Sequence, residues 1–238
     1  MATENVTTLV FDVFGTVVDW RSSIDRDLSA WGAEKGVSPD WMALIDEWKT
    51  AYRPGMDAVN SGERPWTPVG VIYREKLDEL LPKYGLDDLN EEDRQYINEC
   101  WYRLDPWADS LPGMKRLADK YVLSSLSNSD FVGMVQMAKR AGIPFDAVLT
   151  AENAKMFKPD PSVYRMAIDM LGYGVPENVM LVAAHNYDLT HARSHGMGTA
   201  FIPRLTEYGP DQTTDLEPEQ EWDVIASSME DLADKLGC

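Results

Sequence analysis

The chain has 238 residues, of which 44% are hydrophobic and 26% charged, and its formal net charge at pH 7 is −18. This composition is typical of a globular protein with a large core, and the acidic charge argues against nucleic acid and anionic membranes as partners. No apolar run approaches the roughly 20 residues of a membrane span, residues 1–5 lack the features of a signal peptide, and the two cysteines make a disulfide scaffold implausible. We therefore expect a cytoplasmic protein.

The first predicted element is a short buried strand that ends at Asp12. Residues 9–11 form a continuous apolar run, as in a strand of a parallel sheet, and Gly15 soon afterwards allows a sharp turn. Open α/β sheets bind ligands at the carboxyl ends of their strands. A lone Asp at a strand end is more often a helix cap, so Asp12 becomes a functional candidate only together with later motifs.

Residues 19–107 have a different pattern, rich in tryptophan and charged residues, with apolar residues at helical spacing and prolines between the helical stretches. This pattern predicts an all-helical insertion of four or five helices. Its tryptophans either form a homodimer face or belong to the core of the insertion.

From residue 108 onward, predicted strands alternate with predicted helices. We expect strands at 121–126, 147–150, 179–183 and 199–202, and helices around 117, over 134–141, after 161, over 188–195 and over 228–236. The alternation indicates an α/β, Rossmann-like fold with a doubly wound parallel sheet. Because the first strand belongs to this sheet, residues 1–18 and 108–238 form the core, and 19–107 form a helical cap inserted into it. Residues 211–223 are acidic and predicted to be a solvated loop.

Three further stretches place polar residues directly after core strands. Ser127 and Asn128 follow the second strand, where such residues commonly cap a helix. Lys158 precedes a proline at a helix start and should project from its loop, although most lysines are simply solvated. The stretch His-Asn-Tyr-Asp follows the strand at 179–183, and a helix start explains Asp188 but not His185. Each signal is weak alone, but their order on successive strand ends is specific.

This constellation resembles the haloacid dehalogenase-like superfamily, whose motifs are F-D-x-x-G-T, then Ser or Thr, then Lys-Pro, then acidic residues. The resemblance covers essentially the whole chain, including the cap. Superfamily phosphatases carry a second Asp where this chain has Phe14, which cannot transfer a proton. Their Mg²⁺ also needs an acidic pair, for which this chain offers only Asp188, with Ala184 and His185 alongside. We therefore expect neither a metal ion nor another cofactor.

Within the superfamily the chain looks like the type II (S)-2-haloacid dehalogenases. By that resemblance Asp12 attacks carbon 2 of a 2-haloalkanoate, expels halide and forms an ester, which water activated by Asp188 hydrolyses to a 2-hydroxy acid of inverted configuration. A water-poor pocket under the cap should assist the attack. The resemblance also assigns roles to other residues. Thr16, Ser127 and Lys158 position Asp12 and bind the substrate carboxylate, Asn128 helps to bind the departing halide, and Tyr164 forms a hydrogen bond in the site. The residues expected to contribute to the pocket are Val13, Phe14, Trp66, Asn186 and Tyr187.

Two departures from the family pattern concern the halide site. The family has an Arg after a Trp in the second cap helix, whereas here Trp48 is followed by Lys49, with Arg53 one turn later on the same face. Either residue can fill the role. His185 stands where many relatives carry Asn, and a ring there should donate a hydrogen bond and shrink the halide pocket in favour of fluoride. Turnover of bromo- and chloroacids without any turnover of fluoroacetate would contradict that idea.

Three alternatives stay open at this point. The first is an atypical Mg²⁺-dependent phosphatase of the same superfamily, which EDTA would inactivate. The second is a non-catalytic member of the fold, and the third is hydrolytic displacement on another electrophile, such as a strained ring acid. Chain length, preferred halogen and physiological substrate of a dehalogenase are not specified by the sequence.

Overall fold

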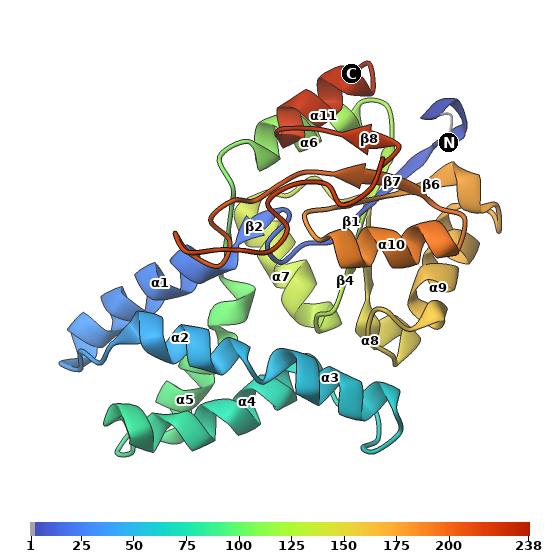
Figure 1. Ribbon diagram of the computed structural model, residues 1–238. Helices are drawn as coiled ribbons and strands as arrows, with labels where there is room; N and C mark the ends of the chain where they lie inside the picture. The colour runs from blue at the N-terminus through green and yellow to red at the C-terminus, as the bar shows by residue number, and fades with distance from the viewer. Residues whose placement is uncertain (1–2) are drawn as a thin grey trace.

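A six-stranded parallel sheet forms the centre of the molecule in the computed structural model, which describes residues 3–238 (Figure 1). Residues 1 and 2 of the predicted core segment lie outside the described residues. The strand order is β5-β4-β1-β6-β7-β8, and the strands are β1 (Thr8–Phe11), β4 (Val122–Ser127), β5 (Ala147–Thr150), β6 (Val179–Ala183), β7 (Gly198–Phe201) and β8 (Val224–Ile225). The α/β, Rossmann-like fold predicted from the sequence is confirmed.

Strand β1 lies inside the sheet, with β4 and then β5 on one side and β6, β7 and β8 on the other. Phe11 lies opposite Ser125 of β4 on one side and Val182 of β6 on the other. The carboxyl ends of β1, β4 and β6 therefore meet where the strand order reverses, which is the position where open α/β sheets bind ligands.

Helices cover both faces of the sheet. Helices α6 (Ser110–Ala118), α7 (Phe131–Ala141) and α11 (Met229–Lys235) pack with Leu9 and Phe11 of β1, whereas α9 (Pro161–Leu171) and α10 (Asn186–Ser194) pack with Val10. Successive strand residues point to opposite faces, and all three are fully buried. This two-sided burial accounts for the continuous apolar runs of the core strands. The short α8 (Ala151–Ala154) and β8 were not predicted, because a single helical turn and a pair of strand residues are both too short to show a period.

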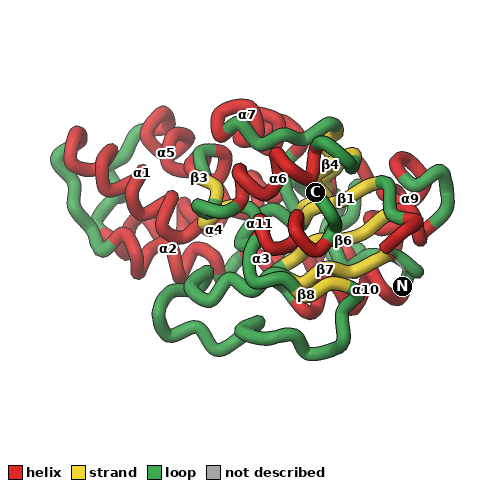
Figure 2. Tube along the Cα trace, turned by 90° about the horizontal axis from the view of Figure 1, so that it is seen from above, coloured by secondary structure: helices red, strands yellow, loops and turns green. Residues whose placement is uncertain are grey.

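The segment between β2 (Val18–Asp19) and β3 (Asp105–Pro106), an antiparallel pair, is helical. Figure 2 shows α1, α2, α4 and α5 gathered at one end of the molecule, beside the sheet. Asp19, Asp40 and Asn90 cap the helices that follow them by accepting a backbone N–H three residues ahead. The helices of this segment are α1 (Trp20–Lys35), α2 (Trp41–Lys49), α3 (Tyr52–Asn60), α4 (Val69–Leu80) and α5 (Glu91–Asn98).

Five of the six tryptophans between β2 and β3 are buried within this chain, and the sixth, Trp66, is half-buried. Trp20, Trp31, Trp41, Trp48 and Trp101 are each between 0% and 6% exposed. These five pack on one another and on tyrosines; Trp48 and Trp101 meet edge to face with ring centroids 5.5 Å apart. They are therefore core residues and offer no exposed aromatic face, while a homodimer stays an untested prediction. No helix within residues 3–238 is both long and apolar enough to cross a membrane.

Asp130 connects the helical segment to the core. It lies at the start of α7, where its Oδ2 accepts hydrogen bonds from the backbone N–H of Gly70 in α4 (3.0 Å) and from the hydroxyl of Tyr102 (2.7 Å). Burial raises the pKa of this carboxyl, and the hydrogen bonds from Tyr102 and Gly70 oppose the rise. The contact therefore depends on donors from the helical segment to offset the cost of a buried acid.

Tyr102→Phe should lower the free energy of unfolding by about 1–3 kcal/mol, because it leaves a buried carboxylate short of a donor. Tyr84→Phe is the matched control, since its hydroxyl bonds Glu47, which is partly exposed and also pairs with Lys83. The control should change stability by less than about 0.5 kcal/mol. Urea unfolding of both variants measures the difference, and equal effects would contradict the role given to Asp130.

Candidate active site

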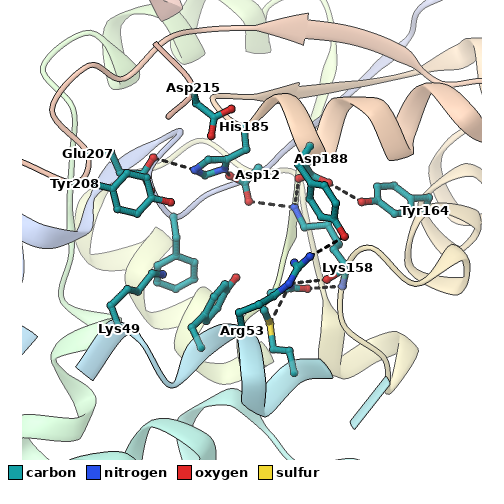
Figure 3. Close-up of a pocket in the computed structure, with 15 residues that line it drawn as sticks. Asp12, Lys49, Arg53, Lys158, Tyr164, His185, Asp188, Glu207, Tyr208 and Asp215 are labelled. Atoms are coloured by element: carbon teal, nitrogen blue, oxygen red, sulfur yellow. Dashed lines mark hydrogen bonds and ion pairs between the residues drawn. The ribbon is translucent and has the colours of Figure 1, made fainter. Parts of the chain in front are cut away.

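A cavity of about 340 Å³ lies at the carboxyl ends of β1, β4 and β6 (Figure 3). Its size suits a small organic ligand. Core strand ends supply one side, α2 and α3 supply another, and the loop after β7 closes the third. The lining residues are Asp12, Phe14, Lys49, Tyr52, Arg53, Met56, Asn128, Lys158, Tyr164, His185, Tyr187, Asp188, Glu207, Tyr208 and Asp215.

Lys158 bridges the two carboxylates that sequence reasoning singled out. Its ammonium group lies 3.0 Å from Asp12 Oδ1 and also donates to Asp188 Oδ2 (Figure 3). The other oxygen of Asp188 accepts the hydroxyl of Tyr164 at 2.7 Å. All four side chains are buried. One cation thus serves two acids that would otherwise repel each other in a low-dielectric site.

The charges in this group fix its protonation states. Burial on its own would raise the pKa of Asp12, but Lys158, His185 and Thr16 outweigh it and hold that pKa well below its ordinary value. Burial likewise opposes the charge of Lys158, but Asp12 and Asp188 hold its pKa above the ordinary lysine value. Asp12 is therefore an ionised carboxylate at neutral pH.

Neighbouring strand ends hold these groups in place. The Thr16 hydroxyl donates to Asp12 Oδ2 (2.8 Å) and accepts the backbone N–H of Ala184 (2.8 Å). Asn128 accepts the backbone N–H of Lys158 (2.7 Å) and donates to its carbonyl (3.2 Å), which fixes the loop that presents the lysine. The hydroxyl of Ser127 is buried without a hydrogen-bond partner within residues 3–238, but Ser127 is not among the residues that line the cavity.

Lys49 and Arg53 both reach the cavity but sit in different surroundings. The Lys49 ammonium lies 4.0 Å from the ring centroid of Tyr52, 4.9 Å from Trp20 and 5.5 Å from Trp101. Burial lowers the pKa of Lys49 to about 8. Arg53 donates to the hydroxyl of Tyr187 (2.7 Å), and its side chain is 50% exposed. Lys49 thus places a cation in the aromatic interior of the cavity, whereas Arg53 places one at its solvent-exposed entrance.

His185 is held between two acids. Its Nδ1 lies 3.0 Å from Asp12 Oδ2 and its Nε2 lies 2.9 Å from Glu207 Oε2. Burial opposes the imidazolium, but Glu207 and Asp12 outweigh it and hold the pKa of His185 well above its ordinary value. Both N–H groups are therefore occupied, which leaves none for the halide hydrogen bond expected from the sequence.

Three expected pocket residues do not line the cavity. Val13 is fully buried in the core at the turn after β1. Trp66 packs on Phe157, with ring centroids 4.8 Å apart. The Asn186 side chain bonds Asp215 Oδ1, the carbonyl of Glu217 and the indole of Trp222, so it anchors the long loop before β8.

The residues that sequence reasoning missed come from α3 and from the loop after β7. Tyr52 and Met56 have only the spacing of ordinary helix residues, and Glu207 and Tyr208 lie where no periodic pattern exists. Asp215 was assigned to a solvated loop but lines the cavity. Within residues 3–238, no group of three or more His, Cys, Asp or Glu side chains is arranged to hold a metal ion; the expected absence of a metal stays a prediction.

The fold and the four strand-end motifs together define a haloacid dehalogenase-like protein. No family model matches the chain. Among solved structures, the L-2-haloacid dehalogenase PA0810 is 44% identical, with a TM-score of 0.94 over 97% of this chain and 98% of that one. The defluorinating L-2-haloacid dehalogenase Rha0230 is 39% identical, with a TM-score of 0.93 over 98% and 96%. The (S)-2-haloacid dehalogenase of Pseudomonas putida is 25% identical over 205 residues, which are 84% of this chain and 86% of that one.

The chain belongs to the family of L-2-haloacid dehalogenases. It is accordingly a hydrolase that acts on carbon–halide bonds, as the motifs indicated.

Lys158→Gln should destabilise the protein by about 3–5 kcal/mol at pH 7, because it leaves two buried carboxylates without their cation. The loss should shrink toward about pH 5, since the freed carboxylates then take up protons. Lys155→Gln is the control, because that side chain is 58% exposed and 3.7 Å from Glu152. Chemical unfolding at both pH values measures the effect, and a pH-independent loss would contradict the assigned charges.

Proposed function

We propose that the protein hydrolyses (S)-2-haloalkanoates, haloacetates among them, through an ester on Asp12 and without a metal ion. The observation that carries this proposal is the Lys158 bridge. It keeps Asp12 ionised at the floor of a small cavity, and it supplies at Asp12 and Asp188 the positive charge that a metal ion would otherwise provide.

The proposed reaction has two steps. Asp12 attacks carbon 2 of the substrate, and the halide leaves with the electron pair of the carbon–halogen bond. Water then attacks the carbonyl carbon of the Asp12 ester, and Asp188 takes its proton. The hydrogen bond from Tyr164 and the ion pair with Lys158 orient Asp188 for this step.

The substrate anion needs positive charge and free donors in a protein of net charge −18. We assign its carboxylate to Lys158, whose ammonium group lies in the cavity beside Asp12 and Asp188. Arg53 guides the anion in at the mouth. The departing halide goes to Lys49 and Asn128, because the aromatic wall around Lys49 excludes water and strengthens a halide–ammonium contact.

Fluoroacetate belongs within the proposed substrate range. The His185 ring occupies space that a smaller side chain would leave open, and one relative of 39% identity is a defluorinating enzyme. Pocket size, and not a hydrogen bond from His185, carries this part of the proposal.

The test is halide release from chloroacetate, fluoroacetate and (S)-2-chloropropionate with EDTA present. The native protein should release halide, and Asp12→Asn should reduce the rate by at least about 10⁴-fold, because it removes the nucleophile. EDTA should have no effect on the native rate. Absence of release by the folded native protein, together with EDTA-sensitive hydrolysis of phosphate esters with Mg²⁺, would instead establish a phosphatase.

Lys49→Arg tests the halide assignment through pH. A lysine whose pKa is about 8 loses its charge as pH rises through that value. Inhibition of the native enzyme by chloride should therefore weaken about tenfold between pH 7 and pH 9. Arg stays charged, so Lys49→Arg should remove this dependence, whereas Arg53→Lys should leave it in place and raise the substrate KM. The same chloride profile in native protein and Lys49→Arg would refute the assignment.

A further inference from the structure

The two acids around His185 require a doubly protonated ring. A neutral imidazole offers one N–H and one lone pair. With Asp12 Oδ2 at 3.0 Å from Nδ1 and Glu207 Oε2 at 2.9 Å from Nε2, a neutral ring would set its lone pair against one carboxylate (Figure 3). Two favourable contacts need two N–H donors, so the ring is an imidazolium that donates to both acids.

Glu207 is built in as the partner of this imidazolium. Glu207 is only 2% exposed, and its Oε1 accepts the indole N–H of Trp20 at 3.0 Å. Gly15 leaves room for it, since a Cβ there would lie 2.2 Å from the Glu207 carboxyl. A buried carboxylate in a fixed position holds the ring in orientation and stabilises its charge.

The two oxygens of Asp12 have different partners. Among residues 3–238, Oδ1 accepts from Lys158 alone, whereas Oδ2 accepts from both Thr16 (2.8 Å) and His185 (3.0 Å). The Thr16 oxygen itself accepts the N–H of Ala184, so its own proton is directed to Asp12. Oδ1 therefore suits attack on the substrate, and Oδ2 suits the carbonyl oxygen of the ester.

We propose that His185 and Thr16 form an oxyanion hole for hydrolysis of the Asp12 ester, and that Glu207 is the positioning residue that keeps His185 protonated. This inference rests on the proposed ester intermediate. Donors 2.7–3.1 Å from an oxygen that gains charge are the arrangement that stabilises tetrahedral intermediates.

Oδ1 bonds to carbon 2, and the halide leaves with the bonding pair. Water adds to Cγ while its proton passes to Asp188, and the carbonyl pair moves onto Oδ2, which His185 and Thr16 stabilise. The pair returns as the Cγ–Oδ1 bond breaks; Oδ1 leaves in the hydroxy acid and takes the proton from Asp188. The remaining proton of the added water goes to solvent, which regenerates the Asp12 carboxylate.

Formation of the Asp12 ester and its hydrolysis should depend differently on His185. Attack by Oδ1 moves charge from Asp12 to the halide, so donors on Oδ2 stabilise the starting carboxylate more than this transition state. Hydrolysis of the ester rebuilds charge on Oδ2, so the same donors favour its transition state. Loss of His185 should therefore slow the second step and leave the first step intact.

The experiment uses His185→Ala, which removes the N–H donor of the ring, with excess chloroacetate, measured by rapid quench. We expect a first-turnover release of about one halide per active site, followed by steady-state turnover about 10²-fold below native. The Asp12 ester should accumulate and appear as a mass increase of the intact protein. His195→Gln, which changes a histidine outside the cavity, is the control and should show neither burst nor ester.

Glu207→Gln supplies a second readout that a merely structural role would not move. The charged and titratable groups around the ring are Asp12, Glu207, Lys49, Lys158, Asp188, Tyr208 and Asp215. In the ester Asp12 is neutral, so Glu207 is the carboxylate that keeps His185 protonated. The His185 ring carries its second N–H proton at low pH and loses it as pH rises through the raised pKa of His185, so the N–H donor to Oδ2 is lost at high pH. Glu207→Gln should shift that decline in ester hydrolysis to lower pH.

The outcomes separate this inference from the proposed function. If the native protein forms an Asp12 ester, but His185→Ala loses first-turnover halide release in proportion to steady-state turnover and accumulates no ester, the oxyanion role is wrong. An unmoved pH profile in Glu207→Gln would remove the role of Glu207. If the native protein turns over haloacids without any Asp12 ester, the proposed function and this inference both fall.

Discussion

The Lys158 ammonium between Asp12 and Asp188 is the contact on which the rest of the site depends. In a chain with a net charge of −18, two buried acids and an anionic substrate can share a cavity only if fixed cations offset them. The backbone of Lys158 is in turn clamped by Asn128 from the end of β4. The sheet topology thereby fixes the protonation state of Asp12, since strand ends that meet at one edge bring Asp12, Asn128 and Asp188 together.

Three separate parts of the chain complete this charged centre. The core strand ends hold the acids, the helical segment contributes an aromatic wall with Lys49, and the loop after β7 brings Glu207 to His185. Aromatic rings exclude water, which suits attack by a carboxylate, a weak nucleophile when it is hydrated. The buried tryptophans of the helical segment fix the position of this wall. In the proposed function, Lys49 in the aromatic wall makes halide binding sensitive to pH, because lysine, unlike arginine, can lose its charge there.

Much of the core could be predicted from the sequence because its strands are apolar runs and its polar residues follow them directly. Asp12, Lys158 and Asp188 were found in this way, and the structure brings them together. Glu207 could not be found, because its loop has no periodic pattern and its partner Trp20 lies 187 residues away. Trp66 and Asn186 were misplaced for another reason, because sequence position put them near the site. The loop between α3 and α4 places Trp66 on Phe157, and the side chain of Asn186 bonds Asp215 of the long loop before β8.

The most direct test of the central claim is a single turnover of 2-chloropropionate by excess enzyme in water labelled with a heavy oxygen isotope. If Asp12 forms the ester and water attacks its carbonyl carbon, the label enters the Asp12 carboxylate, and the hydroxy acid of the first turnover carries the unlabelled oxygen of Asp12. Peptide mass analysis locates the label. Label found in the hydroxy acid after one turnover, with Asp12 unlabelled, would mean that water displaces the halide directly and would contradict the account.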